Sequence, residues 1–438
     1  MVSERILWNA SENLTVPDQG TDLPYYRNGQ TWYTVTRQHG WEHALLRGGT
    51  VHRRDFIEQA AAGLTLWNTQ ASAKPDTKGR NRIVPLWGDE TCLLGFGQPN
   101  DEKTAAAFVD KCARHGVTRL IPSGGSHALV EAAHARKIEV HPYSAFNSHG
   151  RHSVTYTWSL DYLEMDPGMP EARKLLDHHR PIWHRPTADL LIGEFAKAHP
   201  QFWSLSRDRK SEVQPGESVS LSLAFPEVRE YETARYLKML KTTGGDGIQL
   251  EFLPRKEDET RTDALGYEDA TVSAFGAKYG RNPLELANDD PDWVQFRADQ
   301  LTNFMREFRR EVSQIYPRIL VSATVIARDI GRSRNGLQDW PTWVRQESID
   351  EIHLWFRTTS DPREVETFTK QAAVAVAGRC PLIVELSCYH VGSFQQPALL
   401  LEAARRARGS GANAIGLYRS HAVEQLGFWP LVEKIASL

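Results

Sequence analysis

The stretch GDGIQLEFLPR, residues 245–255, is the most informative segment for the fold of this chain. Ile248, Leu250 and Phe252 are apolar, and glycine and proline bracket the run, as is typical of a buried strand. Glu251 falls near the far end of this strand, where an unpaired charge costs several kcal/mol of desolvation. A carboxylate at that point therefore needs either a partner or a function.

The composition of the 438-residue chain is that of an ordinary globular protein, with 24% charged and 40% hydrophobic residues. One barrel-sized domain or two smaller domains would both fit this length. The formal net charge of −3 leaves no basic surplus for neutralising phosphates, so nucleic acid is not an expected partner. No run of about 18 apolar residues occurs, so no integral membrane segment is expected.

The four cysteines are predicted to be unpaired. They form no C-x-x-C motif, which disfavours a zinc knuckle or a thioredoxin-like site. Cys380 and Cys388 flank one expected strand, whose rise of about 3.3 Å per residue separates them too far for a disulfide.

An export signal is predicted at residues 51–73. Arg53 and Arg54 precede a moderately apolar stretch, and residues 71–73 form a small-residue cleavage site. This arrangement resembles a bacterial twin-arginine signal, and an amphipathic helix is the alternative. Residues 1–50 are polar and aperiodic, so we interpret them as a disordered or non-native extension, with Val51 as the true start. The mature chain would then be residues 74–438, exported to the periplasm or the outside.

Strand-like and helix-like segments alternate along the mature chain. The expected strands are residues 92–97, 117–122, 138–146, 247–253, 319–326, 349–356, 382–386 and 414–418. Such alternation indicates parallel pairing with right-handed crossovers, and eight repeats favour a closed (β/α)₈ TIM barrel. An open nucleotide-binding sheet is disfavoured, because the turn at residues 95–99 lacks the G-x-G-x-x-G spacing.

Two insertions interrupt the alternation, at about residues 147–226 after strand three and 254–295 after strand four. Within the first, residues 202–206 and 218–225 predict a hairpin outside the barrel. Loops after strand ends build the active face of such a barrel, so long loops there suggest an extended substrate.

Two glutamates fall at corresponding strand ends, Glu251 on strand four and Glu385 on strand seven. Their placement resembles that in a broad clan of retaining glycoside hydrolases with barrel folds. Such enzymes need one carboxylic acid to protonate the leaving oxygen and another to attack the anomeric carbon, about 5–5.5 Å apart. The resemblance implies that Glu251 is the acid/base and Glu385 the nucleophile.

A narrower resemblance covers roughly residues 90–420, to family-10-like glycosyl hydrolase domains. Their strand four typically has the pattern DGI-x-L-D-Y followed by arginine, matched here by residues 246–252 and Arg255. Residues 225–231, FPEVREY, match the element before that strand, and residues 266–267, 275–280, 292–293 and Arg297 match in order. The family usually has aspartate where this chain has Glu251, which puts the acid/base geometry in question.

Several other side chains are expected to line a sugar site. Aromatic faces can stack on sugar rings, and histidine or arginine can donate to hydroxyl groups. The candidates are His141, Tyr143, Trp158, Arg255, His353, Trp355 and Arg419. Arg419 is expected either to pair with Glu385 or to bind an acidic substrate group.

The expected activity is hydrolysis of an oligo- or polysaccharide without a cofactor. The alternative is a catalytically inactive barrel that binds carbohydrate or a cell-surface partner, with both glutamates paired structurally. A metal site at Asp177, His178, His179 and His184 is disfavoured, because their spacing is not H-E-x-x-H.

Overall fold

The structure is a computed structural model of the chain. It describes residues 84–89, 102–123, 125–145, 150–152, 190–192, 194–208, 220–251, 266–327, 337–389 and 392–438. The extension expected at 1–50 and the signal expected at 51–73 lie outside the described residues. So do Trp158, Arg255 and the histidine-containing group at residues 177–184.

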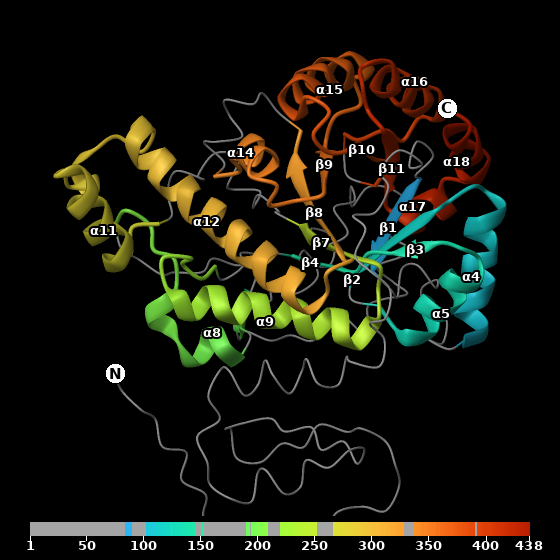
Figure 1. Ribbon diagram of the computed structural model, residues 1–438. Coiled ribbons are helices and arrows are strands. Elements are labelled where there is room, and N and C mark those ends of the chain that lie inside the picture. Colours follow the sequence, from blue (N-terminus) through green and yellow to red (C-terminus); the bar gives the residue numbers. More distant parts are fainter. Residues whose placement is uncertain are drawn as a thin grey trace, which may run out of the picture. The chain divides into compact units, whose positions relative to one another are not determined.

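The core of the fold is a closed barrel of parallel strands, as the alternation predicted (Figure 1). Its strands in chain order are β1 (Pro85–Asp89), β2 (Arg119–Ser123), β3 (Glu139–Val140), β4 (Tyr143–Ala145), β7 (Gly247–Glu251), β8 (Leu320–Ile326), β9 (Glu351–Phe356), β10 (Leu382–Ser387) and β11 (Ala414–Tyr418). β1 pairs with both β2 and β11, which closes the ring. β3 and β4 both pair with β2, so the nine strands of the sheet fill eight positions.

The first strand lies earlier in the chain than expected. β1 occupies Pro85–Asp89, whereas the predicted strand at residues 92–97 lies outside the described residues and is not needed to complete the ring. Leu86 and Trp87 are completely buried, so the apolar run that ends in Trp87 supplies this strand. The prediction missed this strand because its first residue is Pro85, and a proline in an apolar run is usually taken to interrupt a strand.

Helices cover the outside of the barrel (Figure 1). They are α4 (Glu102–Arg114), α5 (His127–Ala135), α9 (Pro226–Thr243), α12 (Pro291–Ile315), α14 (Trp340–Arg345), α15 (Pro362–Val376), α16 (Pro397–Gly409), α17 (Ser420–Gln425) and α18 (Trp429–Ala436). Outward-facing strand residues such as Leu250 and Leu417 join helix residues such as Phe304 and Leu400 in one hydrophobic core. The same apolar core also includes aromatic strand residues such as Trp87 and Trp355.

Helix ends follow the local sequence. Ser126 caps α5, because its side chain accepts a hydrogen bond of 3.2 Å from the Leu129 amide. The last helical segment of the chain is divided into two helices, α17 and α18. Gly427 lies between them with φ of 64°, a left-handed conformation that ends the first helix.

The insertions carry their own small elements. In the first, β5 (Gly150–His152) pairs antiparallel with β6 (Leu190–Ile192), followed by α8 (Glu194–Ala198) and the 3₁₀ helix η2 (Pro200–Phe202). The predicted hairpin is confirmed at its base, where Trp203 pairs antiparallel with Leu221. The second insertion contains α11 (Asp269–Tyr279) and η3 (Pro283–Glu285), and α11 lies beside the start of α12 (Figure 1).

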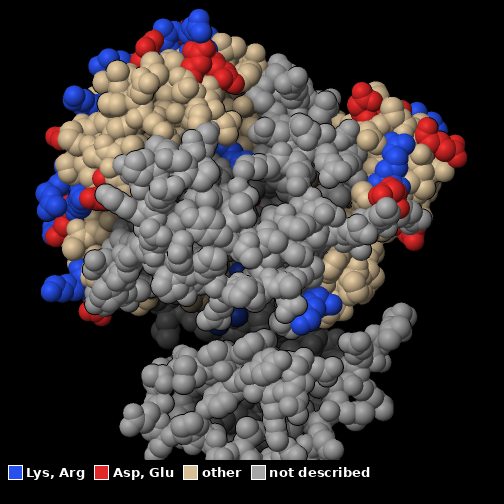
Figure 2. All heavy atoms as spheres, turned by 180° about the vertical axis from the view of Figure 1, so that it is seen from behind, with Lys and Arg blue, Asp and Glu red and all other residues tan. Residues whose placement is uncertain are grey.

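Acidic and basic side chains are interspersed over the described surface of the face in Figure 2, in keeping with the near-neutral charge. Among the described helices, none combines the length and hydrophobicity needed to cross a membrane.

Candidate active site

The interior of the barrel is polar, although barrels of this kind usually fill it with branched apolar side chains. Alternate residues of a strand point to the same face, so each strand contributes one inward row. Side-chain contacts across the barrel identify these rows as including Trp87, Arg119, Glu139, His141, Gln249, Ser322, Thr324, Glu351, His353 and Glu385.

Glu385 is completely buried inside the barrel, on β10. Its Oε1 atom accepts a hydrogen bond of 2.5 Å from Trp87 Nε1 and is in hydrogen-bond contact with His353 Nδ1. Its Oε2 atom has no hydrogen-bond partner among the described residues. Gly416 is its register partner on β11, and a Cβ atom there would lie 3.3 Å from Glu385 Cγ. The carboxylate is thus held by one oxygen, while the other is buried without a hydrogen-bond partner among the described residues.

The protonation of Glu385 is linked to that of His353. Burial raises the pKa of the Glu385 carboxyl, and the opposing effects of His353 and Trp87 do not cancel that rise. Burial by itself would lower the pKa of His353, but Glu385 and Glu351 raise it above its ordinary value. The pair is therefore arranged to keep a proton between them.

Glu251 is the last residue of β7 and is almost completely buried. Gln249, two residues earlier, points into the barrel, because its Nε2 donates a 2.6 Å hydrogen bond to Thr324 Oγ1. The alternation of the strand places Glu251 on the same inward row, at the carboxyl end of the barrel. The two predicted carboxylates therefore both lie on inward rows, of the fourth and seventh strand positions.

Aromatic rings gather beside Glu385. The ring centroids of Trp87 and Tyr143 are 4.8 Å apart, and those of Trp355 and Tyr418 are 4.9 Å apart. Trp87 and Tyr418 are 5.9 Å apart, which connects the two pairs, and Tyr389 lies 6.2 Å from Tyr418. We call these five residues the aromatic wall. Tyr143 and Trp355 were predicted site residues, and the other three were missed.

Arg419 belongs beside this wall. Its guanidinium lies 5.3 Å from the ring centroid of Tyr418 and 5.4 Å from that of Tyr389. Among the described residues Arg419 is not a partner of Glu385, so that expected pairing was wrong.

His141 lies deeper in the barrel than a sugar contact would require. Its ring packs against Gly247, the first residue of β7, where a Cβ atom would approach within 2.6 Å. Its Nε2 lies 3.6 Å from Glu139 Oε2, and burial together with the nearby charge of Arg119 lowers its pKa. The structure therefore places His141 with the interior charges and apart from the aromatic wall.

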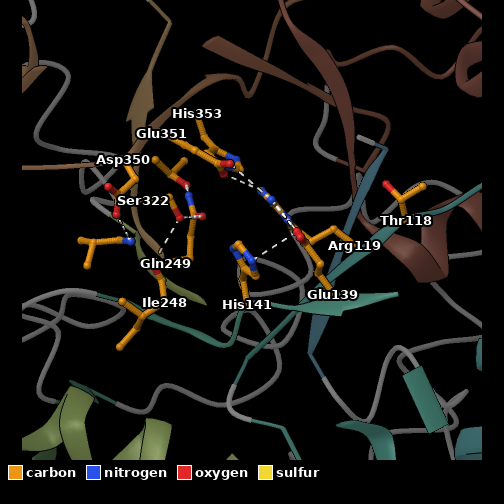
Figure 3. A network of polar contacts seen from close by, with 12 residues as sticks. Thr118, Arg119, Glu139, His141, Ile248, Gln249, Ser322, Asp350, Glu351 and His353 are labelled. Atoms are coloured by element: carbon orange, nitrogen blue, oxygen red, sulfur yellow. Dashed lines mark hydrogen bonds and ion pairs between the residues drawn. The ribbon is translucent and has the colours of Figure 1, made fainter. Parts of the chain in front are cut away.

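Charged side chains of the barrel interior contact one another in a row, which Figure 3 shows from Glu139 to His353. Arg119 Nη2 lies 2.6 Å from Glu139 Oε2, and Arg119 Nη1 lies 2.5 Å from Glu351 Oε2. His353 follows, 3.7 Å from Glu351 Oε2 and in short contact with Glu385. Burial opposes ionisation of Glu351, yet Arg119 and His353 hold its pKa well below the ordinary value. These contacts join the third, second, sixth and seventh strand positions.

Sequence reasoning missed Trp87, Arg119, Glu139 and Glu351. The sequence contained a signal for Arg119, Glu139 and Glu351, because each is a charged residue on or beside an otherwise apolar strand segment. Such a residue needs a buried partner, but nothing local says which one. Within the described residues, no cluster of three metal-ligating side chains is present.

Residues 187–393 match the sequence model of the family described as Glycosyl hydrolase-like 10. This part of the chain is similar to glycosyl hydrolase-like 10 domains. The matched range contains both Glu251 and Glu385, and the resemblance inferred from the motifs is confirmed. No curated protein matches the chain in sequence.

Solved glycosidases share the fold of this chain. The glycoside hydrolase domain of PgaB (BpsB) from Bordetella bronchiseptica is 15% identical, with a TM-score of 0.52, covering 82% of this chain and 99% of that one. The β-galactosidase of Marinomonas ef1 is 11% identical, with a TM-score of 0.51, and the match covers 77% of this chain and 54% of that one. The β-galactosidase of Halorubrum lacusprofundi is 11% identical, with a TM-score of 0.51, and the match covers 81% of this chain and 58% of that one. At these identities the likeness shows the fold alone.

Proposed function

We propose that this protein is a retaining glycoside hydrolase that acts on an oligo- or polysaccharide, with Glu385 as nucleophile and Glu251 as acid/base. The observation that carries the proposal is the state of the Glu385 carboxylate. One oxygen is held by Trp87 and His353, and the other has no partner among the described residues. A nucleophile needs this combination of fixed orientation and a free lone pair.

The reaction follows from these positions. Glu385 Oε2 bonds to the anomeric carbon while the glycosidic C–O bond breaks, and Glu251 gives its proton to the departing oxygen. Glu251, now ionised, takes a proton from a water whose oxygen displaces Glu385, which restores both groups. His353 and Trp87 hold Oε1 throughout, so the carboxylate does not rotate between the two steps.

The aromatic wall supports a sugar as the substrate. Tyr143, Trp355 and Tyr418 are buried aromatic side chains whose ring contacts lead to Trp87, the partner of Glu385. Aromatic faces of this kind pack against the C–H faces of sugar rings. The long insertions after strand positions three and four would extend the contact area along a polymer. The fold neighbours described above are glycosidases, which makes carbohydrate the first substrate class to test.

One observation favours the second candidate, a carbohydrate-binding or cell-surface protein without catalysis. Glu385 is completely buried and Glu251 nearly so, and buried acids often serve structure alone. A catalytically inactive barrel would still bind glycans through the aromatic wall but would not cleave them.

A glycan screen separates the two functions. The mature chain is incubated with a panel of defined oligo- and polysaccharides, and both binding and the release of reducing ends are measured. Cleavage with retained anomeric configuration supports the proposal, and cleavage with inversion rejects the assignment of Glu385 as nucleophile. Binding without cleavage across the panel supports the inactive barrel.

Export completes the proposal. We infer that residues 51–73 direct the protein out of the cytoplasm, on the strength of Arg53, Arg54 and the small residues at 71–73. The inference is tested by N-terminal sequencing of the protein recovered from periplasm and medium. A mature chain beginning near Lys74 is expected, and one that begins well before it would contradict export by this signal.

A further inference from the structure

A cavity of about 300 Å³ lies between the start of α9, α11 and α12. Small-molecule sites begin at about this size. None of its described lining residues belongs to a barrel strand or to the aromatic wall, and Figure 1 shows α11 and the beginning of α12 extending away from the strands. Leu223 and Ala224 come from the end of the first insertion, and α11 comes from the second. The two insertions therefore build a cavity that is separate from the barrel interior.

Aromatic packing keeps α11 apart from α12. Phe275 on α11 is completely buried, and its ring centroid lies 5.1 Å from that of Trp293 and 5.4 Å from that of Phe296, both on α12. Ala270 and Ala274 lie one turn apart on α11 and line the cavity. With only methyl groups at these two positions, the space that the rings keep between the helices stays open.

The charged groups of the cavity balance one another. Arg229 Nε lies 2.8 Å from Glu307 Oε2, and Lys278 Nζ lies 3.8 Å from Asp299 Oδ2. Two cations and two carboxylates leave the described lining without a net charge, so it offers no surplus to an anionic or a cationic ligand. The lining therefore favours a neutral, polar ligand.

The ion pair of Lys278 and Asp299 is too open for a hydrogen bond, at 3.8 Å. Asp299 is held in place from its other oxygen, because Oδ1 accepts a hydrogen bond of 2.8 Å from Gln295 Nε2. A ligand hydroxyl between the two charged groups would accept from the ammonium group and donate to the carboxylate, since a hydroxyl does both.

Two amide side chains add to this capacity. Gln300 Nε2 donates a hydrogen bond of 3.4 Å to Thr271, and Asn303 Oδ1 accepts one of 2.9 Å from Arg306. Among the described residues, neither Gln300 Oε1 nor Asn303 Nδ2 makes a hydrogen bond. The cavity thus offers one further acceptor and one further donor.

From these features we propose that the cavity is a second binding site, which holds a sugar ring of a neutral glycan. The apolar part of its wall, which includes Phe296, suits the C–H groups of such a ring. The charge pair and the two amides suit its hydroxyl groups. The inference goes beyond the proposed function and does not depend on it, because the cavity shares no residue with the barrel interior.

The methyl group of Ala274 reports directly on the cavity. The whole chain is labelled with ¹³C at its alanine methyl groups and titrated with neutral oligosaccharides of glucose, mannose, galactose and N-acetylglucosamine. The Ala274 signal is identified by its absence from A274L. The Ala277 signal is identified in the same way from A277L, and this alanine is exposed on the same helix but does not line the cavity. At least one oligosaccharide should shift the Ala274 signal and leave the Ala277 signal in place.

Filling the cavity should abolish this binding. A274L adds three carbon atoms to the wall and keeps a good helix former. Binding to A274L is followed through the Ala270 signal, which is identified from A270L, and the dissociation constant should rise about tenfold or more. A277L is the matched control and should bind as the wild type does. Q300L/N303L leaves both ion pairs in place and should also weaken binding about tenfold, so the test survives if A274L does not fold.

Oligosaccharides of a uronic acid and of glucosamine serve as charged comparisons. The inference is overturned if no neutral oligosaccharide shifts the Ala274 signal, or if only the charged ones do. Wild-type affinity in folded A274L or in folded Q300L/N303L would overturn it equally. Cleavage is scored separately. A chain that cleaves a glycan but binds none at Ala274 keeps the proposed function and loses this inference, and the reverse result does the opposite.

Discussion

The indole Nε1 of Trp87 donates a hydrogen bond of 2.5 Å to Oε1 of Glu385, a residue 298 positions later in the chain. The two lie on the first and seventh strand positions of the barrel, with β11 between them. Both are completely buried, so water does not compete for this bond. Trp87 therefore fixes which oxygen of the carboxylate is bonded and which is left free.

Replacing Trp87 with phenylalanine keeps most of the ring and removes the N–H donor. A hydrogen bond to a charged group is worth about 1.5–3 kcal/mol, so kcat/KM should fall by about 10–100-fold. The pKa of Glu385 should rise, because one group that lowers it is lost. Since the nucleophile must be ionised, the acidic limb of the pH profile should shift to higher pH.

The measurement is kcat/KM against pH for W87F and wild type. Trp340, buried in the hydrophobic core on α14, offers a control in W340F. That variant should leave the acidic limb in place. A W87F profile identical to that of the wild type would mean that the indole bond does not influence Glu385.

Replacing Glu385 with alanine should abolish turnover, by about 10⁴-fold or more, because no covalent glycosyl-enzyme can form. Added azide should enter the vacated space and restore part of the activity with inverted product. Product configuration by NMR provides the check. Azide that restores nothing, on a variant shown to be folded, would argue that Glu385 is not the nucleophile.

The stability of E385Q shows whether a loss of turnover at this position comes from the missing carboxylate or from unfolding. The folded-state pKa of Glu385 is raised, so its ionisation costs stability as pH rises from the ordinary carboxyl range through the folded pKa. Glutamine removes that cost. E385Q should thus unfold at no lower urea concentration than wild type at pH 7, and its relative advantage should vanish at low pH.

Replacing Glu251 with glutamine tests whether Glu251 is the acid/base. Natural linkages need protonation of the leaving oxygen and should be cleaved about 10²–10⁴-fold more slowly. Glycosides with good leaving groups need little protonation, so the first step on them should be nearly unaffected. The rates on the two substrate types are compared in the same preparation. Equal losses on both types would remove Glu251 from this role.

Replacing Gly416 with alanine tests the space around Glu385. The added Cβ would lie 3.3 Å from Glu385 Cγ and 3.3 Å from Pro85 Cβ, so the glutamate must move by a few tenths of an ångström. Small displacements of a nucleophile are costly, and kcat should fall about tenfold or more. Gly409, at the end of α16, has nothing near its would-be Cβ, so G409A is the matched control with full activity. Wild-type kcat in G416A would show that the site tolerates such a shift.

The interior charges predict a loss of stability in acid. Burial opposes ionisation of Glu139, but His141 and Arg119 lower its pKa to about 2, and that of Glu351 is also well below the ordinary value of 4.5. Groups with depressed folded pKa values stabilise above the ordinary pKa, and this contribution is lost as pH falls through the folded pKa. Urea unfolding should show the free energy of unfolding falling from about pH 4.5 toward pH 2.

E351Q should be less stable than wild type at pH 7 by about 3–5 kcal/mol, because it leaves Arg119 partly unpaired. Its free energy of unfolding should also depend less on pH in the acid range. E402Q is the control, since Glu402 pairs with Arg406 on the surface at 2.8 Å and such pairs contribute about 0–1 kcal/mol. Equal acid slopes in wild type and E351Q would contradict the assignment.

The sequence alone determined the alternation of strands and helices after the first strand, and the location of the two glutamates. Strands and helices alternate with local periods, and a strand of five to eight residues can be recognised from its own composition. Glu251 and Glu385 stood out for the same local reason, as charges at the ends of apolar runs. The motif of residues 246–252 then pointed to the family, which the match over residues 187–393 confirmed.

Only the tertiary structure decided which side chains meet Glu385. Trp87 reaches it because β1 pairs with β11 and β2 and closes the ring, and no local pattern encodes that closure or its register. Arg119 and Glu351 are each recognisable as buried charges, but they lie 232 residues apart, and periodicity says nothing about partners at that distance. Strand alternation is a property of neighbouring residues, whereas the polar interior depends on how all eight strand positions are staggered around the barrel.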